Sequence, residues 1–440
     1  MKHLKRMLAI CLAAGLGCSM VTGCTDSGKN NVDKEKATVD IFQFKVEVND
    51  ALKTATQTYM KEHKNVTINL ETVGGGDDYG AALRTKMSSS DQPEIFNVGG
   101  PQDIVDWKKN LEDLSDQEWI GKVAEGLLDD VSDNGKVYGL PMSVEGYGFL
   151  YNKDIFEAAG IDGESLKTYQ EIDQAFGKLQ EMIEDGKLKD EFPVLEAVME
   201  YPVKETWVTG MHTANVSLGQ EFSSATEAFE SESIDFKYGD QLKDLIDLQV
   251  KYTSSAKTPS NLNAVDYSMQ VGGGYAIERV AVIQQGNWVY PEIKNVDEEV
   301  AQHTGMIPIP LKGVSEGNIP VGVPIYWSVN SGSSDTDKQA AKDFLNWLYQ
   351  SEEGKKIVVD DLGFIPPFTN YGDLAPSDPL SKIVAQHVKD GTIAPWVWTG
   401  APTGWAQESL GVNIQSYVAG EKSWDEVVRE SKADWEKARK

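Results

Sequence analysis

The stretch ATVDIFQFKV at residues 37–46 opens the succession of segments that decides the fold class. It is a short apolar run typical of a buried strand, and Leu52, Ala55 and Tyr59 follow it at helical spacing. NVTINLETV at 65–73 then alternates as a strand does, AALRTKMSSS at 81–90 predicts a helix, and PEIFNVGG at 93–100 predicts a third strand. This β-α-β-α-β order predicts an α/β fold with a parallel sheet, right-handed crossovers and helices on both faces.

Three loops of this sheet are candidates for ligand binding, because ligands of open sheets lie beyond the carboxyl ends of the strands. They are FKVE at 44–47, VGGGDDY at 73–79 and NVGGP at 97–101. Lys45 and Glu47 interrupt an apolar strand end, either as a solvated loop or as a clamp for ligand hydroxyls. Gly99 and Gly100 allow close approach of the backbone to a ligand, or serve a tight turn alone. VGGGDDY has neither a dinucleotide fingerprint nor a P-loop ending.

The rest of the chain predicts a second lobe. Residues 154–257 are rich in helical patterns, strand character returns after residue 279 and lasts through VGVPIYWSVN at 321–330, and a terminal helix begins at Ser423 with the capping-box pattern SWDE. A chain that leaves one lobe, returns and leaves again builds two lobes joined by a hinge of several crossings. We expect an N-terminal α/β lobe from 37–147 and 279–327, and a helix-rich C-terminal lobe from 148–278 and 328–440.

The N-terminal residues predict export. Lys2, Lys5 and Arg6 precede a short apolar run and small residues, which is the layout of a signal peptide over 1–23. VTGC at 21–24 resembles the bacterial lipobox, which implies that Cys24 is lipidated. Residues 24–36 are polar and predict a flexible tether.

Composition excludes several kinds of site. All three cysteines lie before residue 25, so the remaining chain has no disulfide and no thiolate metal site. The net charge is −28, and loss of the three cationic residues of the signal peptide takes it to −31. Such a charge repels nucleic acid and anionic lipid. We therefore expect no nucleic acid as partner, and no pattern in the chain indicates a cofactor.

Segments throughout the chain, taken in order, resemble the extracellular solute-binding proteins of bacterial ABC sugar importers, the group called family 1. They are IFQFKVE (41–47), GKVYGLPMSVEGYGFLYNKDIFEAAGI (135–161), ERVAVIQQGNWV (278–289), GMIPIPL (305–311), VGVPIYWSVN (321–330) and AAKDFLNWLYQSEEGKK (340–356). The resemblance implies a two-lobed, periplasmic-binding-protein-like clamp that closes on a carbohydrate and passes it to a permease. It also implies a monomer held at the extracellular face of the membrane by a lipid such as palmitate, as in Gram-positive bacteria. It fixes neither the sugar nor its linkage.

A sugar site needs flat aromatic faces for the apolar ring surface and polar side chains for the hydroxyls. Of the 11 tryptophans, five lie in helical patterns and are expected to pack the core: Trp107, Trp119, Trp347, Trp424 and Trp435. The others, including Trp405, lie at strand ends or in loops, where binding and packing are both open. Gln285 beside Asn287 offers a further amide. Our candidate ligand-binding residues are Lys45, Glu47, Gly100, Glu145, Tyr147, Trp207, Asn287, Trp288, Trp327, Trp396 and Trp398.

The sequence leaves two alternatives to a sugar-binding protein: a secreted hydrolase and a binding protein for another solute. A secreted glycoside hydrolase would use a pair of carboxylates, but with 69 acidic residues some pair always exists. No G-x-S-x-G or HExxH motif is present, and the five histidines are dispersed at His3, His63, His212, His303 and His387. We therefore do not expect an enzyme. Within the binding class, the many aromatics favour an oligosaccharide over a monosaccharide or a non-sugar solute such as a peptide.

Overall fold

The first sheet has five strands in the order β2-β1-β3-β12-β6 in the computed structural model, which describes residues 35–74 and 78–440. Strands β2 and β3 run parallel to β1, and β12 is antiparallel to both β3 and β6. The strands are β1 (Ala37–Gln43), β2 (Val66–Thr72), β3 (Ile95–Val98), β6 (Leu140–Pro141) and β12 (Tyr326–Val329). The predicted β-α-β-α-β order with parallel pairing is confirmed.

Helices cover both faces of this sheet, as its alternating side chains require. Val39 and Ile41 of β1 pack in one core with residues of α1 and α12, whereas Phe42 packs in another with residues of α2 and α3. These helices are α1 (Asn49–Glu62), α2 (Tyr79–Met87), α3 (Pro101–Asp106) and α12 (Asp335–Gln350), with α13 (Glu352–Lys356) after α12. A small hairpin of β4 (Ser132–Asp133) and β5 (Lys136–Val137) turns at Asn134 and Gly135, both with positive φ, as the Asn-Gly pair predicts.

The second sheet is ordered β13-β11-β7-β9-β8, and β10 also pairs with β7. Its longest strand is β7, whose eight residues are all buried. The strands are β7 (Glu145–Asn152), β8 (Ala197–Glu200), β9 (Val280–Gly286), β10 (Thr304–Ile307), β11 (Ile319–Gly322) and β13 (Ile393–Pro395).

The second sheet belongs to the helix-rich lobe. Helices α5 and α8 cover one face, and α10 and α14 cover the other. A further all-helical core joins residues of α6, α8, α15 and α16 with two π-helical turns, η5 (Trp207–Thr213) and η11 (Trp405–Gly411). The helices are α4 (Lys153–Ala158), α5 (Tyr169–Glu184), α6 (Ala214–Leu218), α7 (Ala225–Glu230), α8 (Gly239–Lys251), α9 (Tyr267–Gln270), α10 (Tyr290–Val296), α11 (Glu298–Gln302), α14 (Pro379–Asp390), α15 (Val412–Val418) and α16 (Trp424–Ala438). Ser423 and Glu426 form the predicted capping box of α16.

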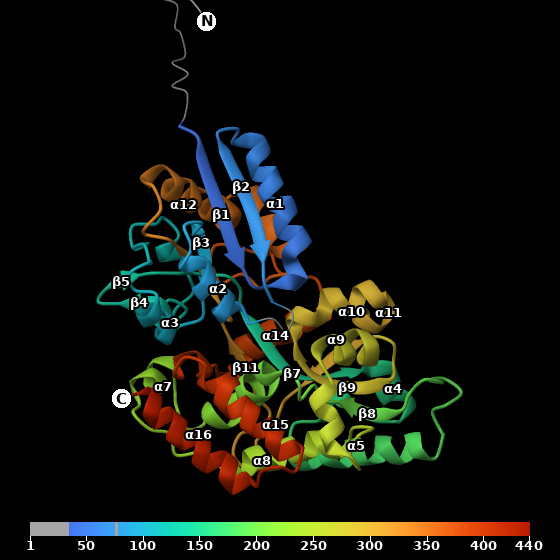
Figure 1. Cartoon of the computed structure of the whole chain (residues 1–440). Helices are drawn as coiled ribbons and strands as arrows, with labels where there is room; N and C mark the ends of the chain where they lie inside the picture. Colours follow the sequence, from blue (N-terminus) through green and yellow to red (C-terminus); the bar gives the residue numbers. More distant parts are fainter. Residues whose placement is uncertain (1–34, 75–77) are drawn as a thin grey trace, which may run out of the picture. The chain divides into compact units, whose positions relative to one another are not determined.

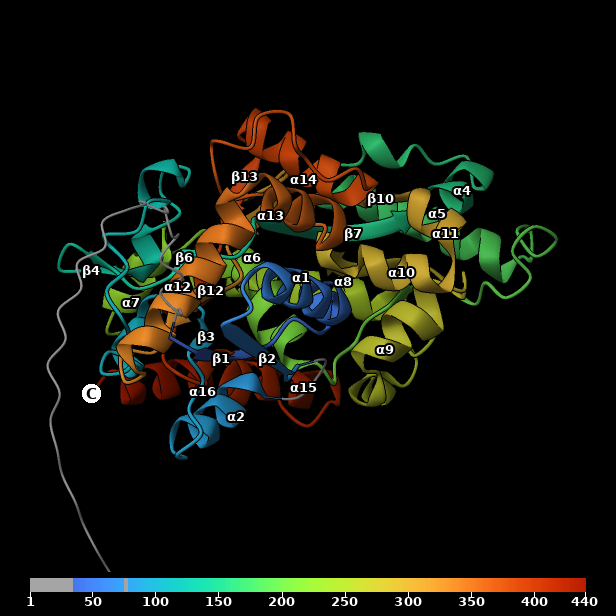
Figure 2. The same ribbon diagram turned by 90° about the horizontal axis from the view of Figure 1, so that it is seen from above.

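The chain passes between the two sheets three times, at 142–144, 323–325 and 372–378. Figure 1 shows β1, β2, α1 and α12 on one side of these crossings and β8, β9, α8 and α16 on the other, and Figure 2 shows α1 and α12 from above. The α/β fold with two lobes is the predicted one. Among the described residues, no helix has both the length and the apolar character needed to span a membrane.

The strand pairing corrects the expected lobe boundaries. Strands β9, β10 and β11 belong to the second sheet, so 279–322 lies in the second lobe and not in the first. Helix α12 and the segment through residue 371 pack on the first sheet, so 328–371 belongs to the first lobe. The physical reason is that strand partners are set by contacts distant in sequence, and a strand such as β9, which is buried on both faces, has no polar face that would assign it to one sheet.

Candidate functional site

Lys45 joins the two lobes at the carboxyl end of β1. Its side chain is 3% exposed, and its Nζ lies 2.6 Å from Glu145 Oε1, at the start of β7, and 2.8 Å from Glu47 Oε1. Gln43 fixes the backbone, because its Oε1 accepts from Lys45 N at 2.6 Å and its Nε2 donates to Lys45 O at 3.0 Å. The three charged residues expected at this strand end and crossing therefore form one group.

Two carboxylates share the ammonium of Lys45. Burial alone would lower the pKa of Lys45, but the charges of Glu145 and Glu47 overcome it and raise this pKa above its ordinary value. Burial raises the pKa of Glu145, against the opposing effect of Lys45. Lys45 therefore stays protonated at neutral pH, and the group offers both charge-assisted donors and acceptors.

A cluster of rings, which we call the His212 cluster, lies beside this charged group. It consists of His212, Tyr147, Trp207, Trp288, Trp396 and Trp398. The imidazole stacks on Tyr147 at 4.6 Å between centroids, with an interplanar angle of 15°. The four indoles surround the imidazole at centroid distances of 5.2 to 6.3 Å, in tilted or edge-on arrangements.

Hydrogen bonds orient three of these rings. The Tyr147 hydroxyl donates to His212 O at 2.7 Å, which links β7 to η5. Trp288 Nε1 donates to Gln285 Oε1 at 3.1 Å, and Trp207 Nε1 donates to Glu205 Oε2 at 2.9 Å. The cluster is thus built from strand ends and a π-helical turn that are held by buried polar groups.

His212 is the residue that sequence reasoning missed. Burial, together with the smaller effect of the nearby charge of Lys45, lowers its pKa to about 3. The imidazole is therefore neutral across the physiological range and behaves as one more flat ring. The signal in the sequence is the segment WVTGMHT (207–213), but its π-helical geometry, which brings Trp207 and His212 together, has no sequence pattern of its own.

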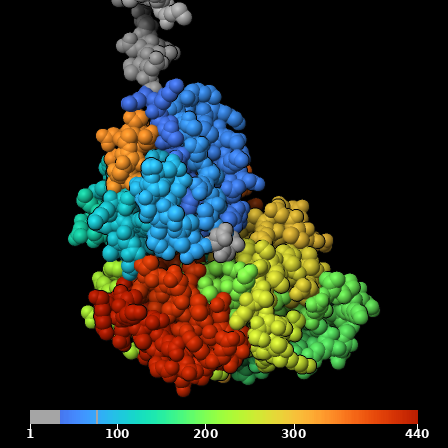
Figure 3. Space-filling view, in the orientation of Figure 1, coloured from blue at the N-terminus to red at the C-terminus, as the bar shows by residue number. Residues whose placement is uncertain are grey.

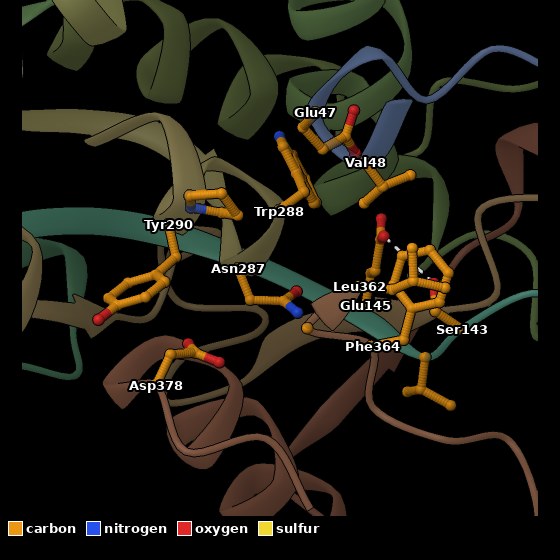
Figure 4. A pocket seen from close by; sticks show the side chains of 13 residues that line it. Glu47, Val48, Ser143, Glu145, Asn287, Trp288, Tyr290, Leu362, Phe364 and Asp378 are labelled. Carbon is orange, nitrogen blue, oxygen red and sulfur yellow. Dashed lines mark hydrogen bonds between the residues drawn. The ribbon is translucent and has the colours of Figure 1, made fainter. Parts of the chain in front are cut away.

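A small pocket adjoins the cluster at the chain crossings. Figure 4 shows the ring of Trp288 beside the carboxylates of Glu47 and Glu145, with Leu362 and Phe364 on the other side. Asn287 also lines this pocket.

Asn287 has both ends of its amide engaged within the protein. Its Oδ1 accepts from Gly146 N at 3.1 Å, and its Nδ2 donates to Ser381 Oγ at 3.3 Å. It therefore holds β7 to α14 at the edge of the site.

Gly100 lies at a second contact between the lobes. A Cβ on Gly100 would lie 2.8 Å from Thr399 Cβ of the second lobe. Nearby, Thr403 Oγ1 donates to Asp106 Oδ2 at 2.5 Å, and Arg439 Nη1 donates to Gln102 Oε1 at 2.8 Å. Figure 3 shows the C-terminal residues, in red, directly against the cyan surface of the first lobe.

Two tryptophans expected in loops or at strand ends lie in cores instead. Trp327 is 2% exposed on β12 and donates to the Tyr349 hydroxyl at 2.9 Å, within the first lobe. Trp405 is 3% exposed and donates to Ser431 O at 2.8 Å, within the helical core. The structure does not bring Trp327 to the other candidates. Cys24 lies outside the described residues.

The site thus combines flat rings from the second lobe with charged and glycine positions from the first lobe, at the junction between them. No group of His, Cys, Asp and Glu suited to a metal ion occurs among the described residues. Rings next to buried charged hydrogen-bonding groups suit a ligand with both an apolar face and many hydroxyls.

Known proteins share this sequence pattern and architecture. The family described as bacterial extracellular solute-binding protein matches residues 45–355. The multiple sugar-binding protein of Streptococcus mutans is 22% identical over 397 residues, which cover 88% of this chain and 87% of that protein.

Solved structures share the fold. A chitin oligosaccharide binding protein superposes with a TM-score of 0.72 at 20% identity, covering 92% of this chain and 99% of that one. A solute-binding protein called RafE, in complex with raffinose, gives a TM-score of 0.67 at 18% identity, covering 91% and 100%. The chain belongs to the bacterial extracellular solute-binding proteins.

Proposed function

We propose that this protein captures an oligosaccharide between its lobes and delivers it to the permease of an ABC importer. The His212 cluster carries the proposal. Several aromatic faces within ring-contact distance of one another suit a ligand of two or more sugar units, each of which needs its own platform. Relatives named for multiple sugars, raffinose and chitin oligosaccharide support the same ligand class.

In the proposed function, sugar binding is coupled to closure of the two lobes. The rings of the second lobe take the apolar sugar faces, and closure brings Lys45 and Glu47 of the first lobe onto the hydroxyls. Hydroxyls that find no partner in the closed junction cost binding free energy, so polar groups select among sugars. The closed form then presents both lobes to the permease.

A hydrolytic role is disfavoured by the state of the two nearest carboxylates. Glu47 and Glu145 both bind the ammonium of Lys45, so neither is free to contact a glycosidic oxygen as the acid of a glycosidase does. The family to which the chain belongs is one of binding proteins.

Attachment to the membrane by a lipid on Cys24 completes the proposal. The VTGC segment and the polar residues that follow it support an anchored protein at the extracellular face. Mass spectrometry of the mature N terminus tests this point, since a diacylated Cys24 gives a mass that simple cleavage does not.

Thermal unfolding of the mature chain across a panel of sugars tests the ligand. The panel contains raffinose, stachyose, melibiose, chitin oligosaccharides and arabinooligosaccharides, with their monosaccharides as controls. A ligand at 100 times its dissociation constant adds about 2.7 kcal/mol to the free energy of unfolding and raises Tm by a few degrees. Selective stabilisation by one oligosaccharide series is the expected result. The proposal would be contradicted if no sugar raised Tm while a peptide mixture did.

A further inference from the structure

Three buried polar atoms within four consecutive residues have no hydrogen-bond partner among the described residues. They are Trp396 Nε1, Trp398 Nε1 and Thr399 Oγ1. Trp396 is 6% exposed and Thr399 is 8% exposed. Buried polar groups are normally paired, so three unpaired ones in so short a segment need an explanation.

Other buried indoles of the chain do find acceptors. Trp207, Trp288, Trp327, Trp405 and Trp435 each donate to a carboxylate, amide, hydroxyl or carbonyl oxygen. Trp424 Nε1 is also unpaired, but it lies in the helical core away from the lobe junction. Side chains elsewhere, such as Gln249 and Gln284, also have unpaired buried atoms, but at 396–399 three such atoms lie within four consecutive residues beside the site.

The backbone of the same segment is firmly held. Asn215, which is fully buried on α6, donates from Nδ2 to Pro395 O at 2.9 Å and accepts at Oδ1 from Val397 N at 2.8 Å. The segment is thus fixed on either side of Trp396 while the side-chain donors stay free. Fixed geometry with free donors is what a preorganised binding site requires.

The residues of the row contact the two surfaces that the proposed function assigns to the ligand. The rings of Trp396 and Trp398 contact His212 at 5.7 and 6.3 Å between centroids. Thr399 lies against Gly100 of the first lobe. A ligand bound between the lobes and beside the His212 cluster would therefore lie close enough to supply acceptors.

We propose that Trp396 Nε1, Trp398 Nε1 and Thr399 Oγ1 form a hydrogen-bonding row that binds acceptor oxygens of the sugar. The inference rests on the proposed function and deepens it, because it gives two indoles a polar role beyond stacking. The groups that fit are oxygens that need only accept: a hydroxyl, a ring or glycosidic ether, or the carbonyl of an acetamido group. Two N–H groups in the row only donate, so a sugar that offers no acceptor at this place binds less tightly.

Phenylalanine substitutions distinguish the contribution of the indole N–H group from that of the aromatic ring. Trp396→Phe and Trp398→Phe keep an aromatic face and remove one donor each, and Thr399→Val removes the hydroxyl at nearly constant volume. The matched control is Trp405→Phe, which breaks a satisfied bond to Ser431 O in the helical core. Isothermal titration with raffinose, stachyose and a chitin oligosaccharide measures affinity, and calorimetry without sugar measures Tm.

Affinity and Tm together are expected to separate the row from the control. For the sugar that wild type binds, each variant of the row weakens affinity by roughly 2- to 10-fold, the value of one lost hydrogen bond. In the absence of sugar, Trp396→Phe lowers Tm by less than Trp405→Phe does, because it removes a donor that was already unpaired. Loss confined to the chitin oligosaccharide assigns the acetamido carbonyl, and loss with raffinose or stachyose assigns a hydroxyl or ether oxygen.

If wild type binds one of these sugars and all three variants bind it with the same affinity, the inference is overturned and the proposed function is not. A fall in Tm for Trp396→Phe as large as that for Trp405→Phe would overturn it as well, since the indole would then have had a partner. No binding of any of these sugars by wild type would instead overturn the proposed function, and the inference with it.

Discussion

Lys45 Nζ lies 2.6 Å from Glu145 Oε1, so one ion pair ties the end of β1 in the first lobe to the start of β7 in the second. Both side chains are nearly excluded from solvent, at 3% and 6% exposed. The pair lies where the chain crosses between the lobes and where the His212 cluster begins. A change at either residue should affect both stability and binding.

Lys45→Met should destabilise the protein by about 3–5 kcal/mol, because it leaves the buried Glu145 without its cation. Urea unfolding measures the free energy. Lys86→Met is the control: its partner Glu71 is 54% exposed, so this loss should cost about 1 kcal/mol or less. Equal effects of the two substitutions would show that the Lys45 pair is not desolvated.

Removing a ring from the His212 cluster should weaken sugar binding. Trp288→Ala and His212→Ala should each raise Kd by at least about fivefold, which corresponds to about 1 kcal/mol for a buried aromatic anchor. His212→Phe retains a flat ring and should retain most of the affinity. Trp347→Ala, in α12 of the first lobe, is the control that should leave Kd unchanged. Wild-type affinity in both Ala variants would refute this site.

The titration of His212 should contribute to the pH dependence of the free energy of unfolding. Its pKa is lowered from 6.5 to about 3 in the folded state, so between these values the unfolded chain takes up a proton that the folded chain does not. The stability that this group contributes is intact above pH 6.5 and is lost as the pH falls toward 3. Unfolding curves of His212→Phe should therefore fall less steeply with acid, by at most about 1.4 kcal/mol per pH unit.

The titration of His303 should change the free energy of unfolding with pH in the opposite direction. Its hydrogen bond and charge pairing with Asp154 raise its pKa, so its contribution is present below pH 6.5 and is lost as the pH rises through its folded-state pKa. Between its raised folded-state pKa and pH 6.5, wild type gains stability from this group as the pH falls, and His303→Gln should lack that gain. The same direction of change in both variants would contradict these assignments.

Gly100→Ala should weaken sugar binding through lobe closure. The φ of Gly100 is 165°, an extended conformation open to any residue, so the substitution causes no backbone strain. The added Cβ would lie 2.8 Å from Thr399 Cβ and push the lobes apart. Gly99→Ala is the control, because its Cβ would meet only Asp103 Oδ2 at 3.3 Å. Titration calorimetry should show a higher Kd for Gly100→Ala than for Gly99→Ala, and equal values would show that closure does not use this contact.

The first lobe could be predicted from sequence because its signals are local. Strand β1 alternates Val39 and Ile41 toward one core, and α1 repeats its apolar residues at helical spacing. The position of β9 could not be predicted, because all seven of its residues are buried and nothing in them selects a partner strand. Lobe boundaries that depend on such strands need the tertiary contacts.

The candidate site was predicted in part. Lys45, Glu47 and Glu145 stood out as charges within apolar segments, and the structure brings them together. The place of Trp327 at a strand end predicts a binding role, but β12 is buried throughout and the indole donates to Tyr349 in the core of the first lobe. His212 is one of five dispersed histidines in the sequence, and only the fold gathers the rings around it.

The gathering of indoles around His212 also makes the molecule its own optical reporter. Four of the 11 tryptophans of the chain lie within ring contact of one imidazole. A bound sugar would change the surroundings of several of these fluorophores at once. The emission of unlabelled protein would then follow the free ligand concentration, and the chain would serve as a reagentless biosensor scaffold for its solute.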